Sequence, residues 1–431
     1  MSAVLEGKKF TIYTLGCKVN QYESDSMEDI LKKEGASLVS FESYADIVII
    51  NTCAVTNMAE RKTRQIIHRA KKKNPNAVVC ACGCYVQSGK DVLEKDDAVD
   101  IIVSNNRKKD IARILEEYFA DSCVSDNYID INKTNEYESM MLYKPTEHTR
   151  AYVKVQDGCN NFCTYCIIPY TRGRIRSRSL EEVLTEINGL AAQGIKEVVI
   201  TGINLSSYKD EKGNGLLELL LSVCKVEGIV RIRMGSLEPR IITDEFLSAI
   251  RNEEKICPHF HLSLQSACDE TLKRMNRKYT IEEYKNRCEL IRKYYAEPAI
   301  TTDVIVGFPG ETKEEFETTC KNLEELNLYE MHIFKYSKRN GTVAATMDNQ
   351  VPEDIKNKRS DILLSMVERH KKAYEDLFRN RKVMILAEEY EKKENGSCFL
   401  KGHTERYIYV SREFDEDFCK RKINEIVEVE M

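Results

Sequence analysis

The N-terminal part of the chain alternates short apolar runs with amphipathic segments. Four of the runs predict buried strands: KKFTIYTLG, ADIVIIN, NAVVCAC and DIIVS. Between them, SDSMEDILKKEG and MAERKTRQIIHRAKKK have the apolar periodicity of helices. Because strands that alternate with helices usually pair in parallel, we expect an α/β domain with a parallel sheet over residues 8–120.

A second alternating series begins at Ala151. The preceding interval, residues 121–144, lacks periodicity and contains the polar NKTNEYESMM, so we expect a linker there. One helix is predicted from Ser179 to Ala192, with a capping box in SLEE and Gly194 at its end. The six candidate strands favour a partial (β/α)6 barrel over residues 145–371. They are AYVKVQ, EVVIT, IVRIRM, HFHLSL, AITTDVIVG and MHIFKY.

The C-terminal part predicts a charged helix from about Pro352 to Asn380 and then a small all-β module over residues 372–431. Its candidate strands are KVMILAEEYE, CFLKGHT, RYIYV and EIVEVE. No apolar run approaches the roughly 20 residues of a membrane span. The start, MSAVLEGKKF, lacks the apolar stretch of a signal peptide. We therefore expect no membrane association and a cytoplasmic location.

Cysteine content is the first indication of chemistry. A cytoplasmic protein keeps its thiols reduced, so clusters among the 16 cysteines suggest metal ligands more than disulfides. The net charge of −5 argues against nucleic-acid binding through bulk positive charge. A local basic surface remains compatible with that charge.

Three cysteines in DGCNNFCTYCIIPYTRGRIRSR, namely Cys159, Cys163 and Cys166, have the spacing CxxxCxxC directly after a predicted strand. A loop of that length can bind three corners of a [4Fe–4S] cube and leave the fourth iron open. A structural zinc site is the alternative, but it normally needs four ligands, usually from two CxxC pairs. The spacing therefore favours an iron–sulfur cluster with an open iron.

Three further cysteines follow predicted strands of the N-terminal domain: Cys17, Cys53, and either Cys82 or Cys84. The carboxyl ends of parallel strands meet at one edge of a sheet, so these thiols can converge and hold a second cluster. Alternatively, they are ordinary core residues, since cysteine is among the most buried residue types.

The chain resembles the radical S-adenosylmethionine (SAM) methylthiotransferase family almost from end to end. The matching segments are GCKVNQYESD, NTCAVTNMAERK, GCYVQ, QDGCNNFCTYCIIPYTRGRIRSR, HFHLSLQS and TTDVIVGFPGET. In that family an N-terminal domain carries an auxiliary [4Fe–4S] cluster, the central domain is the radical SAM core, and a small OB-like TRAM barrel binds substrate. The resemblance thus implies these roles for residues 8–120, 145–371 and 372–431.

The resemblance also implies two [4Fe–4S] clusters and their ligands. The auxiliary cluster corresponds to Cys17, Cys53 and Cys84, and the SAM-binding cluster to Cys159, Cys163 and Cys166; all six count as catalytic. Cys84 matches because Gly83 precedes it, as in the family pattern. Cys82 is the competing ligand, since Cys80, Cys82 and Cys84 could share one face of a strand.

SAM is the second implied cofactor, with its amino and carboxylate groups on the open iron. Tyr165 matches the family position beside the adenine, and core packing is its other interpretation. Gly202 and Asn204, in TGINLSSY, occupy the place of a short glycine motif near the SAM amino group. The ends of later strands add Ser236, Glu238, Gln265 and Asp303.

The implied reaction inserts a methylthio group at an unactivated C–H bond and uses two SAM molecules per turnover. One SAM donates a methyl group to sulfur on the auxiliary cluster, and the other yields the radical that abstracts hydrogen. GCKVNQYES, NTCAVTN, VQDGCNNFC, SLEP and HFHLSLQS are similar to one subfamily. That subfamily converts N6-threonylcarbamoyladenosine (t6A) at tRNA position 37 into its 2-methylthio derivative, ms2t6A.

The implied partners are tRNA, through adenosine 37 of the anticodon loop, and an electron donor such as flavodoxin or ferredoxin. The sequence does not identify the sulfur source. Two alternative functions are methylthiolation of isopentenyladenosine tRNA and methylthiolation of ribosomal protein S12. Two others are a radical SAM methylase without sulfur insertion and a non-catalytic iron–sulfur RNA-binding module.

Basic and aromatic side chains suggest RNA contacts, each with a simpler alternative. The run Arg172, Arg174, Arg176 and Arg178 suits phosphate, or is solvated surface charge. The predicted helix with Arg61, Lys62, Arg64, His68 and Lys71 to Lys73 has the same two interpretations. Tyr407 and Tyr409 either stack on bases or fill the small barrel.

Overall fold

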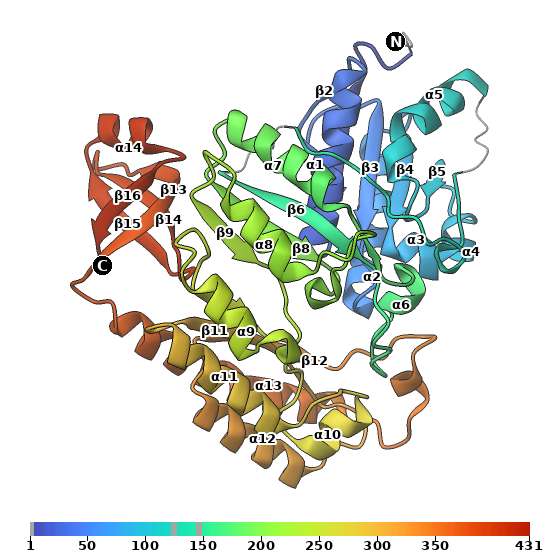
Figure 1. Ribbon diagram of the computed structural model, residues 1–431. Helices are drawn as coiled ribbons and strands as arrows, with labels where there is room; N and C mark the ends of the chain where they lie inside the picture. Colours follow the sequence, from blue (N-terminus) through green and yellow to red (C-terminus); the bar gives the residue numbers. More distant parts are fainter. Residues whose placement is uncertain (1–3, 122–126, 144–148) are drawn as a thin grey trace.

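The computed structural model describes residues 4–121, 127–143 and 149–431. Figure 1 shows an N-terminal module in blue, a central one in green to orange and a small C-terminal one in red. The parallel sheet of the first module has the strand order β2-β1-β3-β4-β5. Its elements are β1 (Lys9–Thr14), α1 (Lys18–Lys33), β2 (Ser37–Leu38), β3 (Ile47–Thr52), α2 (Asn57–Lys73), β4 (Val78–Gly83), α3 (Cys84–Ser88), α4 (Lys90–Leu93), β5 (Ile101–Val103), η1 (Lys108–Asp110) and α5 (Ile111–Asp121).

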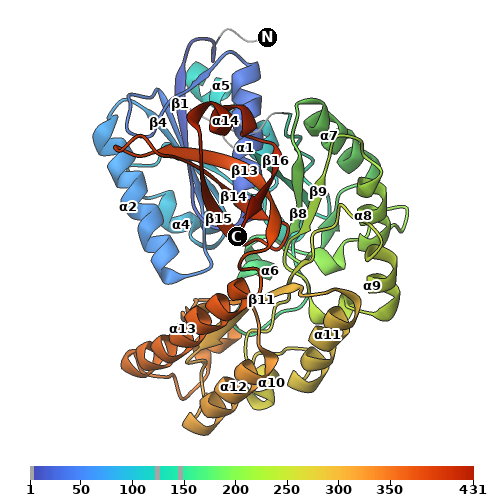
Figure 2. The same cartoon turned by 90° about the vertical axis from the view of Figure 1, so that its left-hand side faces the viewer.

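Helices cover both faces of this sheet, which explains why β3 and β4 are buried along their whole length. On one face, Tyr22 and Met27 of α1 and Ile114 of α5 join a core that continues into the central module. On the other face, Ile66 and Ile67 of α2 form a second core. Figure 2 shows α2 on the side of the module away from α1. The predicted parallel-sheet module is confirmed.

The central module is an open half-barrel of six parallel strands, as predicted, with the two-residue strand β7 added antiparallel to β6 at one edge. Two parallel bridges, Ile232 to Ile256 and Leu237 to Leu262, join its two sheets, β7-β6-β8-β9 and β10-β11-β12. The segment that precedes it carries η2 (Ile131–Lys133). The elements of the central module are β6 (Arg150–Asp157), α6 (Ile168–Thr171), β7 (Arg176–Ser177), α7 (Leu180–Ala192), β8 (Glu197–Gly202), η3 (Leu205–Ser207), α8 (Leu216–Cys224), β9 (Arg231–Met234), η4 (Pro239–Ile241), α9 (Asp244–Ile250), β10 (His259–His261), α10 (Asp269–Arg274), α11 (Ile281–Tyr294), β11 (Ala299–Val306), α12 (Lys313–Leu326), β12 (Glu330–Lys335), η5 (Val343–Thr346) and α13 (Glu353–Asp376).

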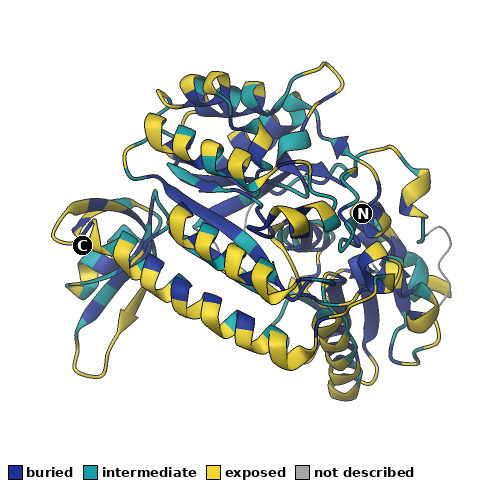
Figure 3. Ribbon diagram, turned by 90° about the horizontal axis from the view of Figure 1, so that it is seen from below, coloured by how far each residue is buried: buried dark blue, intermediate teal, exposed yellow. Residues whose placement is uncertain are grey.

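The helices of the half-barrel lie outside its strands. Figure 3 shows their outer faces exposed and the strands largely buried. The predicted cap of α7 is present, since the Ser179 hydroxyl accepts a hydrogen bond from the Glu182 N–H. Among the described residues, no helix combines the length and the apolar character needed to cross a membrane.

The segment between the two α/β modules packs against them. Of its described part, residues 127–143, Ile131, Met140 and Leu142 are buried, and the Glu138 carboxylate accepts hydrogen bonds from backbone N–H groups of the first module. Residues 122–126 and 144 of the predicted linker, and 145–148 of the predicted core, lie outside the described residues.

The C-terminal module is a four-stranded antiparallel sheet with the order β15-β14-β13-β16. The predicted strand RYIYV starts later than expected, at Tyr409, because Tyr407 adopts a left-handed φ of 66° in a tight turn. Helix α14 was not predicted; Asp415 caps it by accepting a hydrogen bond from the Phe418 N–H. The elements are β13 (Lys382–Lys392), β14 (Cys398–Thr404), β15 (Tyr409–Phe414), α14 (Glu416–Lys422) and β16 (Ile426–Glu430).

The turn around Tyr407 closes the amino end of the half-barrel. Arg150 donates to the Tyr407 hydroxyl at 3.2 Å, and the Arg233 guanidinium lies 4.7 Å from the ring centre. Arg233 also donates to the backbone carbonyls of Thr404 and Glu405 and pairs with the buried Glu197 at 2.9 Å. Tyr407 therefore fills the end of the central barrel, whereas Tyr409 is 49% exposed.

We predict that Arg233→Ala destabilises the protein by about 3 kcal/mol, because it leaves buried Glu197 with fewer cationic partners and frees the C-terminal turn. Urea midpoints of the purified proteins measure this effect. The matched control is Arg369→Ala, which breaks an exposed ion pair with Glu324 and should cost less than about 1 kcal/mol. Equal midpoints for the two variants would contradict the docking role of Arg233.

Candidate functional site

Cys17, Cys53 and Cys84 follow β1, β3 and β4 at the carboxyl edge of the first sheet. A side-chain carbon added to Gly16 would lie 3.2 Å from the Cys53 sulfur, so the first two loops are in contact. Burial, together with the neighbouring Cys84 and Cys17 thiols, raises the pKa of Cys53 to about 12. A bound cation would favour the thiolate form of Cys53.

Cys80 and Cys82 do not share a face with Cys84, contrary to the expectation from strand alternation. Both pack in the core that joins the first two modules, whereas Cys84 belongs to the core under α2. Gly83 causes the change of direction: its φ is 92°, and an added side-chain carbon would lie 2.5 Å from the Thr52 carbonyl oxygen. The structure thus brings Cys84, not Cys82, beside Cys17 and Cys53.

Arg172 is a fully buried contact of the Cys17–Cys53–Cys84 group. Its Nε donates to the Cys84 sulfur at 3.2 Å. Its Nη1 donates to Glu23 at 2.9 Å and to Asp157 at 3.2 Å. One guanidinium therefore joins a cysteine of the first module to the segment that leads into Cys159.

Glu23 and Asp157 belong to a wider buried ion network between the two modules. Lys154 pairs with both carboxylates, at 2.7 Å and 2.6 Å, and Lys108 pairs with Glu23 at 2.9 Å. Burial opposes ionisation of Glu23, but Arg172 and the two lysines hold its pKa well below the usual range. Buried charges that are this fully paired fix α1 against β6.

Cys159, Cys163 and Cys166 lie in the loop between β6 and α6. Arg277 donates to the Cys163 sulfur at 3.3 Å, and the Asn204 amide lies 3.9 Å from the Cys159 sulfur. Burial and the neighbouring Cys163 raise the pKa of Cys166 to about 12. As in the first group, the thiols are crowded and one of them accepts a hydrogen bond from an arginine.

The two cysteine groups meet at two adjoining hollows. The first, of about 370 Å³, is lined by Cys17 from the first group and Cys166 from the second, with Asp303 and Phe334 on its wall. The second, of about 170 Å³, is lined by Cys159, Cys163 and Cys166. Tyr165, Cys166, Ile168 and Gln265 line both hollows. Residues from two sheets therefore face a shared cavity.

Most of the predicted SAM contacts are in these hollows. Asn204, Ser236 and Glu238 line the smaller one, Asp303 lines the larger one, and Tyr165 and Gln265 line both. Gly202 instead packs on Gln156, whose Oε1 accepts a hydrogen bond from the Asn204 N–H at 2.7 Å. Neither Gln156 nor Arg277 was predicted, because no local pattern distinguishes them from other polar residues.

Both interpretations of the arginine run were wrong for three of its members. Three of the arginines are buried and pair with carboxylates: Arg172, Arg176 and Arg178. They are therefore neither solvated nor available to bind phosphate. Arg174 is exposed. The basic side chains on α2 are mostly exposed, which fits both interpretations of that helix.

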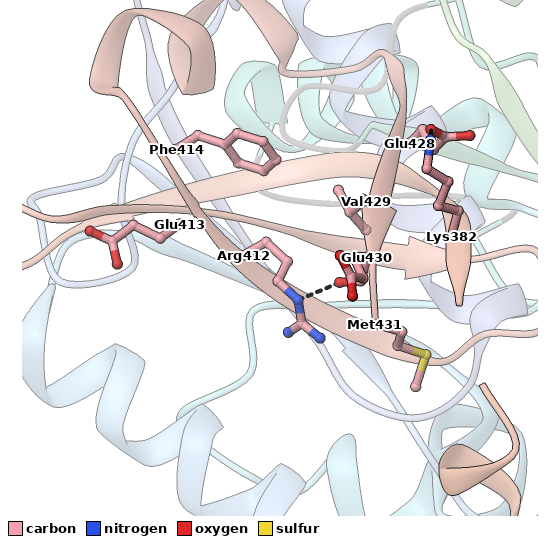
Figure 4. A pocket seen from close by; sticks show the side chains of 8 residues that line it. All are labelled: Lys382, Arg412, Glu413, Phe414, Glu428, Val429, Glu430 and Met431. Atoms are coloured by element: carbon pink, nitrogen blue, oxygen red, sulfur yellow. Dashed lines mark hydrogen bonds and ion pairs between the residues drawn. The ribbon is translucent and has the colours of Figure 1, made fainter. Parts of the chain in front are cut away.

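Figure 4 shows a separate pocket of about 490 Å³ on the C-terminal module, lined by Lys382, Arg412, Glu413, Phe414, Glu428, Val429, Glu430 and Met431. Arg412 donates to the backbone carbonyl of Glu430, and Lys382 pairs with Glu428 at 2.7 Å. None of the predicted site residues lines this pocket, so it lies outside the candidate site.

Comparison with known proteins agrees with this architecture. Residues 153–323 match the radical SAM superfamily, and residues 9–104 match the uncharacterized protein family UPF0004. The fold is similar to the radical S-adenosylmethionine methyltransferase TsrM from Kitasatospora setae, with a TM-score of 0.58 and 15% identity over 78% of this chain and 74% of that one. Fold and cysteine loop together define a radical SAM enzyme.

Two relatives specify the family. The chain is 39% identical to the threonylcarbamoyladenosine tRNA methylthiotransferase MtaB of Bacillus subtilis (strain 168), over 97% of this chain and 92% of that protein. It is 36% identical to the tRNA-2-methylthio-N(6)-dimethylallyladenosine synthase of Acetivibrio thermocellus, over 98% and 89%. The chain therefore belongs to the radical SAM methylthiotransferases, which are transferases that use SAM and two [4Fe–4S] clusters.

The donor sets of the structure fit these cofactors. Each cysteine group supplies three thiols, which is the number that leaves one iron of a cube open. Cys17 and Cys166 line the larger hollow, and the amide and hydroxyl groups of the smaller hollow suit the polar groups of SAM.

We predict that Arg172→Gln destabilises the protein by about 3 kcal/mol or more and lowers its iron content after anaerobic gel filtration. The variant leaves Glu23 and Asp157 short of a cation and removes the donor to Cys84. Urea midpoints and iron analysis measure the two effects. Arg174→Gln, an exposed change in the same segment, should leave both close to wild type; equal losses in both variants would refute the role of Arg172.

Proposed function

We propose that this enzyme adds a methylthio group to C2 of t6A at position 37 of tRNA, giving ms2t6A, with two SAM molecules per turnover. The observation that carries the proposal is the meeting of two cysteine groups, from separate modules, at one cavity. The name of the Bacillus subtilis relative supports t6A as the substrate. A cavity between the groups suits a reaction that joins a substrate carbon to sulfur held at a second cluster.

In this proposal Cys17, Cys53 and Cys84 bind the auxiliary cluster, and Cys159, Cys163 and Cys166 bind the SAM-binding cluster. SAM at a reduced cluster supplies a carbon radical, which can take hydrogen from an unactivated C–H bond. Arg172 and Arg277 each orient one sulfur through an N–H···S hydrogen bond. The buried ion network keeps the two groups at a constant separation.

Asn204, Ser236 and Glu238 of the smaller hollow would provide polar contacts to SAM, with Tyr165 and Gln265 on the wall shared with the larger hollow. Gly202 affects the SAM contacts indirectly. It permits the close packing of Gln156, and Gln156 positions Asn204. Asp303 lies on the wall of the larger hollow and does not line the smaller one. Its contact with SAM stays a prediction.

The substrate nucleoside enters the larger hollow. Phe334 lines it with 48% of its surface exposed, and Val55 with 51%, which suits apolar contact with an unstacked base. The exposed basic side chains of α2 provide cations for the tRNA phosphates around that nucleoside. We assign residues 8–120 to the auxiliary-cluster domain, 121–144 to the linker, 145–371 to the radical SAM core and 372–431 to a TRAM domain that binds tRNA. The enzyme works in the cytoplasm with flavodoxin or ferredoxin as electron donor.

A second candidate substrate is tRNA that carries dimethylallyladenosine (isopentenyladenosine) at the same position. The Acetivibrio thermocellus relative, at 36% identity over 98% of the chain, favours it. The two substrates differ in the N6 substituent, which is a charged amino-acid derivative in t6A and an apolar chain in the alternative.

We predict that Cys84→Ala lowers the iron content of the anaerobically purified enzyme by about half, because one of the two clusters loses a ligand. Cys82→Ala is the matched control and should keep its iron, since Cys82 packs in the opposite core. Equal iron loss in both variants would contradict the assignment of Cys84.

We expect deletion of the gene to remove ms2t6A from cellular tRNA and to leave t6A in its place, as measured by nucleoside mass spectrometry. Re-expression of the wild type should restore ms2t6A, whereas a Cys163→Ala variant should not. Loss of the methylthiolated dimethylallyl nucleoside instead would favour the second candidate. An unchanged tRNA profile with a mass change in ribosomal protein S12 would refute both.

A further inference from the structure

Two histidines and an aspartate converge on the inner face of the half-barrel, outside the cysteine groups. His261, Asp303 and His332 come from the neighbouring strands β10, β11 and β12, and Asp303 is the direct cross-strand partner of His332. One ligand atom from each residue lies within 4.8 Å of the others. The strand register therefore places three metal-binding side chains together without help from a mobile loop.

The His261 ring has a fixed orientation. Its Nδ1 is 2.9 Å from the Thr301 hydroxyl, and its Nε2 is 3.3 Å from the Asp303 carboxylate. Metal-bound histidines are usually held by a polar group on one ring nitrogen, as Thr301 holds Nδ1 here, while the other nitrogen binds the ion. Nε2 lies beside the carboxylate that would bind the same ion. The His332 ring stacks on His261 at a centroid distance of 5.8 Å, and His332 is exposed toward the barrel interior.

Two arginines below this group are already paired, while Lys18 is a further cation whose charge acts on Asp303. Arg233 and Arg150 pair with Glu197 at 2.9 Å and 3.0 Å, and Arg150 also pairs with Glu388. Asp303 therefore forms no ion pair with these two arginines.

We propose that His261, Asp303 and His332 bind one divalent first-row transition-metal ion. Two imidazole nitrogens and one carboxylate oxygen are a known donor set for Fe(II) and related ions, and they leave coordination positions open. Because Asp303 lines the 370 Å³ hollow, those positions face the space beside Cys17 and Cys166 and would accept an oxygen ligand there. The site borders the larger hollow, which the proposed function gives to the substrate nucleoside, and it gives Asp303 a role different from direct contact with SAM.

The competing interpretation is a hydrogen-bonded His261–Asp303 pair with a second imidazole stacked against it, which requires no ion. The two interpretations differ in one measurable property. A metal site needs His332 for affinity, whereas the hydrogen-bonded pair does not.

The test is a Mn²⁺ titration of the anaerobic holoenzyme, with both clusters in their EPR-silent oxidised state. The loss of the free Mn²⁺ EPR signal counts bound ions, and electron spin-echo modulation reports coordinated imidazole nitrogen. We expect one bound Mn²⁺ per chain with nitrogen coupling. In His332→Asn the dissociation constant should rise at least tenfold and the nitrogen coupling should weaken.

His68→Asn is the matched control, because His68 is an exposed histidine that pairs with Asp96 at 3.1 Å. It should bind Mn²⁺ like the wild type. Circular dichroism and iron content, unchanged in His332→Asn, exclude misfolding as the cause of lost binding. Absence of tight Mn²⁺ binding in the wild type, or equal binding in wild type and His332→Asn, would overturn the proposal whatever the tRNA result is.

Discussion

A guanidinium group without exposed surface sets the relation between the two cysteine-bearing modules. Arg172 would be costly to bury alone, and it is stable because Glu23, Asp157 and the Cys84 sulfur surround it. These partners come from α1, from the end of β6 and from the start of α3. Any displacement of one module against the other would leave a buried charge unpaired, so the two cysteine groups are held in a single arrangement.

The cavity follows from that arrangement. Both sheets present the carboxyl ends of their parallel strands to it, which is the edge where α/β proteins form ligand sites. The C-terminal module closes the opposite end of the half-barrel through Tyr407 and the arginines that begin β6 and β9. The candidate site and the contact with the C-terminal module therefore lie at opposite ends of the strands. Cysteines and polar side chains occupy the carboxyl ends, and paired charges occupy the amino ends.

Much of the fold could be predicted because its signals are local. The strands of both α/β modules are short apolar runs between amphipathic helices, and nearly all lie where the pattern placed them. The failures arose where distant residues decide the outcome. The arginine run was expected at the surface or on phosphate. Instead, two residues of α1, far away in sequence, bind it in the interior: Glu23 pairs with Arg172, and the Tyr22 hydroxyl accepts a hydrogen bond from Arg178. The late start of β15 depends on a left-handed turn at Tyr407 that the barrel end stabilises.

The sequence by itself determined the alternating architecture and the three-cysteine loop, because strand periodicity and the spacing of Cys159, Cys163 and Cys166 are properties of neighbouring residues. It left Cys82 and Cys84 as competitors. The tertiary structure separated them, since Gly83 turns the chain and sends Cys84 to the core under α2, where its thiol neighbours Cys17 and Cys53. The meeting of the two cysteine groups also depends on tertiary structure, because burial and charge pairing act between segments that only folding brings together.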